Sequence, residues 1–410
     1  MDGGPTLTRR RLLAAAGGAA GLAAAGAGGF RLRDEESEPS SESIPFHGGR
    51  QAGITTPAQD RLVFGAFDLE AGAEHDLEGL LRDWSAAAAA FAAGRPLGTP
   101  DYALPAPPVD TGEALGLAPA RLTVTFGLGP ALFAKAGLGD CRPHGLAELP
   151  ALPGDALDPA RSGGDLCVQA CADDPVVAFH AVRNLARLAF GRASLRWLQL
   201  GFGRTSVTST GQETLRNLQG FKDGTNNLDG QDEAAMREFV WAGNEEPQRW
   251  FRGGTYLVTR RIRMLIETWD RSSLDDQQQT IGRYKDSGAP LTGVREHDAV
   301  DLTAKAADGT PVIPPDAHIR LAGPASNGGV RILRRGYSYT DGIDPRTGEL
   351  DAGLFFIAFQ RDLERGFVGI QRRLGATDAL NEYIAHTGSA AFAVPPGAKP
   401  GALVGEGLFA

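Results

Sequence analysis

The chain has 410 residues, of which 42% are hydrophobic and 22% are charged, and its formal net charge is −9 at pH 7. This length is enough for two domains of ordinary size. The acidic balance argues against nucleic acid as a partner, because binding to a phosphate backbone requires clustered lysine and arginine.

The first 45 residues have the pattern of an export segment. Thr8-Arg9-Arg10-Arg11-Leu12-Leu13 is basic, and residues 14–29 form a short run rich in Ala, Gly and Leu. This order is typical of a secretory signal peptide, and the paired arginines favour the twin-arginine (Tat) route, which exports folded proteins. A membrane anchor is the alternative, but so many glycines make a poor spanning helix. Residues 33–43 are acidic and Ser-rich, which favours a disordered tether. We therefore expect export to the periplasm, the cell envelope or the medium.

Residues 46–215 are predicted to form an N-terminal domain. Strand patterns at 61–67, 121–126, 165–170 and 195–202 alternate with helical patterns at 77–93 and 174–189. This is the β-α-β-β-α-β order of a ferredoxin-like unit.

Residues 216–410 repeat that order as a C-terminal domain. The stretch 255–263 alternates apolar and polar residues, as a half-buried strand does. Helical patterns follow at 274–284 and 362–374, and strand patterns at 332–339, 354–360 and 391–394, with a turn at 341–345. The expected fold is α+β, with two ferredoxin-like units whose antiparallel sheets face each other in a barrel-like arrangement.

The three cysteines, Cys141, Cys167 and Cys171, include no Cys-x-x-Cys pair, which argues against a thiolate zinc site. Cys167 and Cys171 share a face of one expected strand but lie too far apart along it to pair easily. They are expected as buried thiols, and a disulfide involving Cys141 stays open.

Three polar segments in the second half carry the chemistry. Gly220-Phe221-Lys222-Asp223-Gly224-Thr225 places an aspartate on a glycine-flanked loop, Asp316–Leu321 contains His318, and Ile332–Tyr339 contains Arg334. An imidazole can ligate haem iron, a carboxylate can move a proton, and a guanidinium can stabilise a developing anion. Together these three groups favour a haem peroxidase.

In this order and spacing, the three segments resemble the dye-decolorizing peroxidase family, most of all its secreted branch, which includes the bacterial deferrochelatase/peroxidase. The resemblance runs from about Phe46 to Val394. It implies haem b as the cofactor, and hydrogen peroxide with a small-molecule or protein reductant as partners. The implied activity is one-electron oxidation of dyes, phenolics or another reductant through a ferryl intermediate. The sequence leaves open whether the protein forms a homo-oligomer.

The resemblance also implies roles for single residues. His318 corresponds to the proximal iron ligand; His297 is the only rival, and its flanks do not match. Asp378 is where relatives carry an acidic residue that hydrogen-bonds the ligating histidine, although a helix N-cap is an equal alternative.

Asp223 corresponds to the distal acid/base, against the alternative that Asp223-Gly224 is a plain turn. Arg334 corresponds to the distal arginine, and its neighbour Arg335 must point to the other face of a strand. The remaining implied contacts are with the haem edge or a propionate and with the distal pocket wall. They involve Gly224, Thr225, Asn226, Leu354 and Phe356.

Three alternatives remain at this stage. A deferrochelatase that releases iron from intact porphyrin would share every motif. A haem carrier without turnover would keep His318 but would not need the pair of Asp223 and Arg334. An enzyme like chlorite dismutase would share the architecture but lack the Gly-x-x-Asp-Gly loop.

Overall fold

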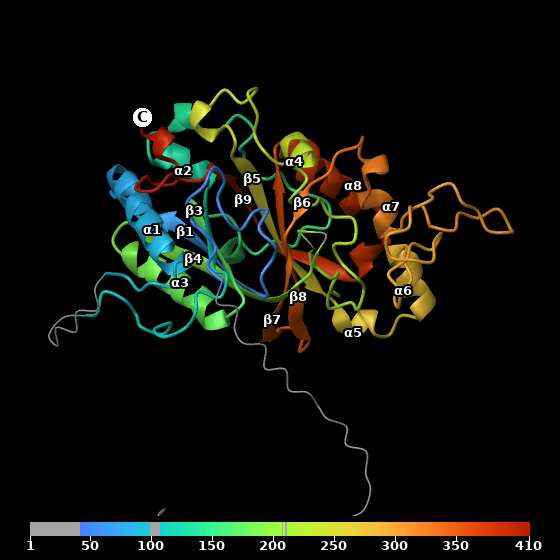
Figure 1. Ribbon diagram of the computed structural model, residues 1–410. Coiled ribbons are helices and arrows are strands. Elements are labelled where there is room, and N and C mark those ends of the chain that lie inside the picture. The colour runs from blue at the N-terminus through green and yellow to red at the C-terminus, as the bar shows by residue number, and fades with distance from the viewer. Residues whose placement is uncertain (1–41, 99–106, 207, 210) are drawn as a thin grey trace, which may run out of the picture. The chain divides into compact units, whose positions relative to one another are not determined.

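A computed structural model describes residues 42–98, 107–206, 208–209 and 211–410 (Figure 1). The described residues belong to one compact unit. The expected signal peptide lies outside them, as does nearly all of the expected tether. Among the helices described, none combines the length and apolar character that crossing a bilayer would take.

The described strands form one antiparallel sheet that closes on itself. Their order is β5-β9-β2-β3-β1-β4-β7-β8-β6, and β5 also pairs with β8, so that all strands except β6 form a ring. The fold is therefore mixed α/β with a barrel-like sheet. The strands are β1 (Arg61–Leu69), β2 (Thr123–Leu128), β3 (Leu166–Ala172), β4 (Ala193–Arg204), β5 (Thr255–Met264), β6 (Leu333–Arg334), β7 (Tyr337–Ile343), β8 (Leu350–Gln360) and β9 (Ile384–Val394).

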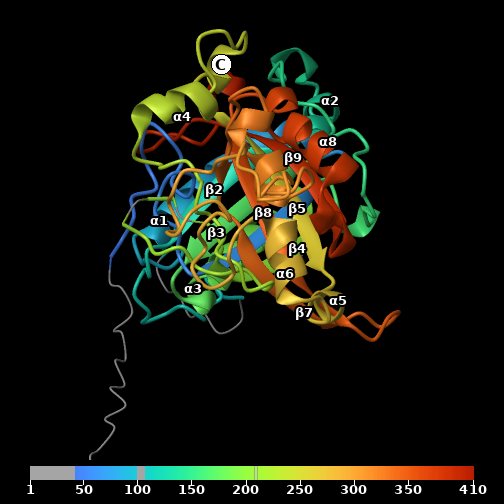
Figure 2. The same cartoon turned by 90° about the vertical axis from the view of Figure 1, so that its right-hand side faces the viewer.

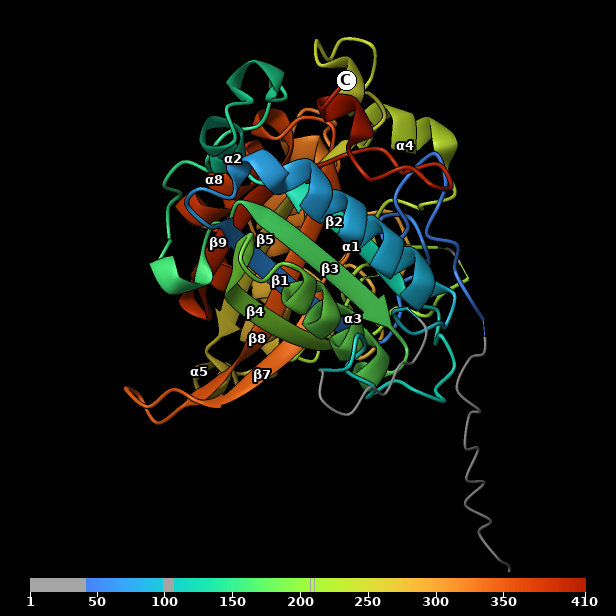
Figure 3. The same cartoon turned by 90° about the vertical axis from the view of Figure 1, so that its left-hand side faces the viewer.

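Helices cover the outside of this sheet. Helices α1 and α3 lie across the N-terminal strands β1, β3 and β4 (Figure 3), and α6 and α8 lie in front of β5 and β8 (Figure 2). The α-helices are α1 (Leu77–Ala92), α2 (Pro130–Lys135), α3 (Pro175–Leu188), α4 (Glu233–Phe239), α5 (Ile266–Trp269), α6 (Leu274–Ile281), α7 (His318–Ala322) and α8 (Gly369–Thr377).

The barrel interior is one apolar core shared by both halves of the chain. Because strand residues alternate between faces, every second side chain of β1 and β5 points inward. Phe64 of β1 stacks on Trp197 of β4, with ring centroids 5.4 Å apart, and lies 5.4 Å from Phe355 of β8. Cys167 and Cys171 are free, buried thiols in this core, as expected, and Cys141 is also free.

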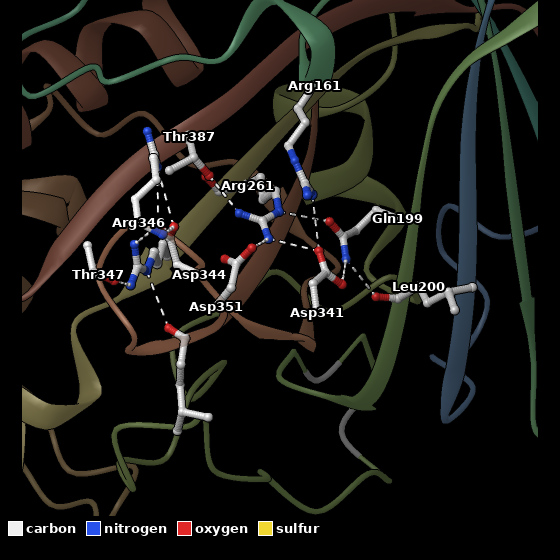
Figure 4. A network of polar contacts seen from close by, with 12 residues as sticks. Arg161, Gln199, Leu200, Arg261, Asp341, Asp344, Arg346, Thr347, Asp351 and Thr387 are labelled. Atoms are coloured by element: carbon white, nitrogen blue, oxygen red, sulfur yellow. Dashed lines mark hydrogen bonds and ion pairs between the residues drawn. The ribbon is translucent and has the colours of Figure 1, made fainter.

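A charged network joins strands of both halves (Figure 4). At its centre is Arg261 of β5, whose side chain is 5% exposed. Its guanidinium donates to Gln199 of β4 over 3.0 Å and lies 2.8 Å from the carboxylates of Asp341 and Asp351. It also donates to Thr387 of β9 over 2.9 Å. One buried cation thus links β4, β5, β7, β8 and β9.

Several expected boundaries are wrong. The strand expected at 332–339 is interrupted after Arg334, and its continuation β7 runs to Ile343, so the turn lies at 344–349 rather than 341–345. The helix expected to reach residue 284 ends at Ile281, because Gly282 adopts φ 89° and caps it in the left-handed region. The helix expected at 362–374 begins as a π-helix at Glu364 and ends at Thr377.

Candidate active site

The three polar segments identified in the sequence line one cavity. It lies on the outer face of β5, β8 and β9, beneath α7, α8 and the loop at 217–226. Every site residue expected from the sequence lines it: Asp223, Gly224, Thr225, Asn226, His318, Arg334, Leu354, Phe356 and Asp378. The rival His297 does not line it, and its side chain is 72% exposed.

His318 is the first residue of the short helix α7, which packs against α8. Its Nδ1 lies 2.6 Å from Oδ2 of Asp378, a residue that is only 5% exposed. The other oxygen of Asp378 accepts a hydrogen bond from Leu380 N over 2.9 Å, so this carboxylate both caps a helical turn and orients the imidazole. Burial is the largest single influence and lowers the pKa of His318, but the charge of Asp378, its hydrogen bond and the charge of Asp223 together outweigh burial and raise the pKa above its ordinary value.

Asp223 and Arg334 form an ion pair at the same cavity. Nη1 of Arg334 donates to Oδ1 of Asp223 over 2.7 Å, and the second oxygen of Asp223 accepts from Asn217 over 3.3 Å. Gly224 has φ 98°, a left-handed conformation that favours glycine, so the loop can turn directly after the aspartate. The pair stays partly accessible, with side-chain exposures of 28% for Arg334 and 15% for Asp223.

The adjacent Arg335 points the opposite way. It is fully buried in the barrel interior, where its guanidinium donates to the carbonyl of Thr56 and the side chain of Gln59. Strand alternation therefore brings Arg334, not Arg335, to the cavity.

Asn227 is a site residue that the sequence analysis missed. Its Nδ2 donates to the backbone carbonyl of Arg334 over 2.8 Å, and its Oδ1 accepts from the backbone N–H of Arg334 over 2.8 Å. The amide therefore pairs with the outer edge of β6 as a neighbouring strand would. Its place two residues beyond Thr225, at the end of the Asp-Gly loop, was the available signal.

Arg260 and His386 were also missed, because neither belongs to a recognised motif. Arg260 is 1% exposed, pairs with Asp155, and donates to Ser389 over 3.0 Å. His386 is 4% exposed, and its Nε2 lies 3.1 Å from Nε2 of Gln371. Both reach the cavity because strand alternation points them to the outer faces of β5 and β9.

The residues that line the cavity fit a metal ion whose ligands are supplied mainly by a bound macrocycle. Within the described part of the chain, no group of three or more His, Cys, Asp or Glu could hold a metal ion. With Nδ1 of His318 engaged by Asp378, Nε2 is the ring nitrogen left to ligate iron. Much of the wall is apolar, as the faces of a porphyrin require. Its apolar members include Phe221, Ile262, Ile281, Ile319, Ile332, Leu354, Phe356, Phe367, Ile370 and Leu374.

Comparisons with known proteins show the family to which the chain belongs. Models of the Dyp-type peroxidase N-terminal and C-terminal regions match residues 51–203 and 214–399. A deferrochelatase of Escherichia coli strain K12 is 41% identical over 367 residues, which is 88% of this chain and 85% of that protein.

Solved structures with a similar fold include peroxidases of the same type. The oxyferrous complex of DtpA from Streptomyces lividans has a TM-score of 0.83 and 42% identity, covering 91% of this chain and 99% of that one. A DyP-type peroxidase from Cellulomonas bogoriensis has a TM-score of 0.81 and 42% identity, with coverage of 91% and 99%.

The fold and the cavity define a haem-dependent peroxidase. The chain belongs to the Dyp-type peroxidase family.

Proposed function

We propose that His318 would hold the iron of haem b through Nε2, and that Asp223 and Arg334 assist the cleavage of hydrogen peroxide. The supporting observation is that the Asp223–Arg334 ion pair of 2.7 Å and the His318–Asp378 pair of 2.6 Å line one cavity. When bound, haem supplies the iron at which peroxide is reduced and the oxidising equivalents are held.

The side chains supply proton transfer and charge. Asp223 accepts a proton from one peroxide oxygen and returns it to the other, which then leaves as water. Arg334 stabilises the negative charge that develops on the oxygen atoms. Asp378 holds His318 in one orientation and makes its Nε2 a stronger donor to a metal. The Gly224–Asn226 backbone and the apolar wall of Leu354 and Phe356 are proposed to contact the ring.

Two variants separate these roles. We expect His318→Ala to lose most of the haem, whereas Asp223→Ala should bind haem normally and react with peroxide roughly 10²- to 10⁴-fold more slowly. The haem-to-protein ratio, the Soret spectrum and stopped-flow rates measure both effects, with His297→Ala as the matched control. Full haem occupancy with an unchanged spectrum in His318→Ala would exclude it as the ligand. An unchanged rate in Asp223→Ala would make that residue a structural turn.

A second candidate function is removal of iron from haem with the porphyrin intact. It is favoured by the 41% identity to deferrochelatase over most of both chains. Product analysis separates the two functions, because a deferrochelatase accumulates free protoporphyrin and a peroxidase oxidises a dye or phenol catalytically. A haem carrier would show neither activity and would have no use for the Asp223–Arg334 pair.

The finer organisation is also proposed here. Within the ring, the strands of the first half run β2-β3-β1-β4 and those of the second half β9-β5-β8-β7. These orders support two ferredoxin-like units divided near residue 215, with strands β4 and β7 pairing across the division. We further propose Tat-dependent export with haem already bound, on the strength of the paired arginines at the start of the chain.

A further inference from the structure

A second cavity adjoins the cavity that is proposed to hold haem, which we call the haem cavity. Its volume is about 880 Å³, within the roughly 300–1,000 Å³ that is usual for small-molecule sites. Val330 and Arg331 line both cavities, so the two share a wall. We call the second one the acidic cavity, because more carboxylates than arginines line it. Its charged members are Glu148, Glu238, Glu245, Glu246, Asp362 and Glu364, with Arg331, Arg361 and Arg365.

The start of β5 and the end of β8 contribute a buried acceptor to the acidic cavity. Tyr256 and Gln360 pair across these strands, and strand alternation puts them on the same face as Arg260 and Phe356 of the haem cavity. Gln360 is only 1% exposed. Its Nε2 donates to the carbonyls of Tyr256 over 2.7 Å and of Ala358 over 3.3 Å, which fixes the orientation of the amide. Among the described residues its Oε1 has no hydrogen-bond partner, so this acceptor is open to an N–H group of a ligand.

Glu246 adds a buried carboxylate, which Tyr256 connects to Gln360. Glu246 is 7% exposed, and its Oε2 accepts from the hydroxyl of Tyr256 over 3.2 Å. Its Oε1 accepts from the backbone N–H groups of Gln248 over 3.1 Å and His144 over 3.3 Å. In the part of the chain that the structure describes, these partners are neutral and no cation pairs with Glu246. A buried charge without a counter-ion is costly, so a cationic ligand at this point would be stabilising.

Two of the three arginines of the acidic cavity are held by other partners. Arg361 forms an ion pair with Glu245. Arg331 donates to the carbonyls of Asn226 and Asn227, at the border with the haem cavity. The rest of the wall is partly apolar, and its apolar members include Leu149, Phe239, Ala242, Leu363 and Val368. The acidic cavity therefore suits an ammonium group that is joined to an aromatic ring.

We propose that the acidic cavity binds a phenol that carries an ammonium group, with Glu246 as its counter-ion and Oε1 of Gln360 as its hydrogen-bond acceptor. A phenol with an alkylammonium group fits better than an aniline, because the nitrogen of an aniline is too weak a base to be charged near neutral pH. The role of this phenol as an electron donor rests on the proposed function, whereas its binding does not. Two such molecules each give one electron and one proton and become phenoxyl radicals, and hydrogen peroxide is reduced to two molecules of water.

Three phenols of similar shape and different charge test the site: tyramine is cationic, para-ethylphenol is neutral and para-hydroxyphenylpropionate is anionic. Isothermal titration calorimetry of the haem-loaded protein without peroxide measures their binding. We expect tyramine to bind at least about 10-fold more tightly than para-ethylphenol, the effect of a hydrogen bond to a charged group, and the anion to bind most weakly. In turnover with peroxide, kcat/KM should favour tyramine over para-ethylphenol in the same way.

Two variants assign this preference to the acidic cavity. Glu246→Gln keeps the shape of the side chain and should remove the preference for tyramine in both binding and turnover. Gln360→Met removes the acceptor and should weaken tyramine binding by roughly 5-fold. Glu70→Gln is the matched control, because Glu70 is an exposed glutamate that lines neither cavity, and it should keep the wild-type preference.

Circular dichroism and haem content show whether each variant is folded, and the comparison of the three phenols in the wild type tests the site even where a variant fails to fold. Equal binding of the three phenols overturns the proposal, as does a preference for tyramine that persists in Glu246→Gln. If tyramine binds with the expected preference but the wild type oxidises none of the three phenols, the proposed function fails and the cation site stands.

Discussion

Arg334 and Arg335 are neighbours in sequence with opposite surroundings. Arg334 contacts Asp223 at the cavity, while Arg335 is fully buried in the barrel and bonds to Thr56 and Gln59. We expect Arg334→Leu to slow the reaction with peroxide by roughly 10²- to 10³-fold with little change in melting temperature. Arg335→Leu should lower the melting temperature and leave the rate nearly unchanged. Stopped-flow absorbance and thermal denaturation measure both, and an exchange of the two behaviours would contradict the assignment.

Asn227 should act through Arg334. Its amide pairs with the backbone N–H and C=O of Arg334 at the outer edge of β6, which holds the backbone from which the guanidinium extends toward Asp223. Asn227→Ala leaves both backbone groups without this partner, and in the role proposed for Arg334 a displacement of about 1 Å costs on the order of 10²-fold in rate. We therefore expect a loss of that size, with haem occupancy retained.

A double-mutant cycle distinguishes positioning from general stability. In an Arg334→Leu background, Asn227→Ala should slow the reaction little further, because the group that it positions is gone. The effect of Asn227→Ala on melting temperature should be the same in both backgrounds. Asn184→Ala is the control, since Asn184 is a buried asparagine on α3 that bonds to Thr111 and the carbonyl of His180. Additive losses of rate would refute the positioning role.

At the scale of elements, the regular strands could be predicted and the interruptions could not. The alternating pattern at 255–263 correctly indicates β5, because one face of that strand meets the core and the other a cavity. The break between β6 and β7 falls at Arg335 and Gly336; a glycine inside a strand pattern often marks an irregularity, but it does not show that the pairing stops there. Helix α7 is only five residues long, and tertiary contacts rather than its own sequence stabilise it.

The same limit applies to the site. The motif residues could be placed together from the resemblance, but Arg260, His386 and Asn227 could not. The positions of Arg260 and His386 follow from the register of β5 against β9, which pairs residues 120 to 139 positions apart. Asn227 meets Arg334, which lies 107 positions further along the chain. Sequence alternation predicts the face of a strand on which a side chain lies but not its partner across the sheet.

Arg261 should help to join the two halves of the chain, because its buried guanidinium contacts side chains of β4, β7, β8 and β9. Its guanidinium is 5% exposed and meets two carboxylates, so removing it leaves Asp341 and Asp351 without their common partner. We expect Arg261→Met to lower the free energy of unfolding by about 3–5 kcal/mol. Arg346→Met is the control, because the Arg346 side chain is 85% exposed and its loss should change stability by less than about 1 kcal/mol. Urea denaturation measures the free energy of unfolding of both variants. An unchanged value in Arg261→Met would show that the network does not stabilise the fold.

At the scale of the whole molecule, His386 should make folding sensitive to acid. Burial, and then the nearby charge of Arg260, lowers the pKa of His386 from its ordinary 6.5 to about 4. Between these two values the unfolded chain binds a proton that the folded protein does not, so stability rises with pH across this window and is lost as pH falls through it. A difference of this size corresponds to about 3 kcal/mol.

We therefore expect the unfolding free energy of the haem-loaded protein to fall between pH 6.5 and pH 4, and His386→Gln to show a shallower slope there. The remaining slope reports the other titrating groups of the chain. His297→Gln is the control, because the side chain of His297 is 72% exposed and its removal should leave the slope as in the wild type. Denaturation curves at closely spaced pH values measure the three slopes. If His386→Gln retains the wild-type slope, the folded protein does not hold the pKa of His386 below its ordinary value, and the nearby carboxylates of Asp155 and Asp378 offset the burial of the imidazole and the charge of Arg260.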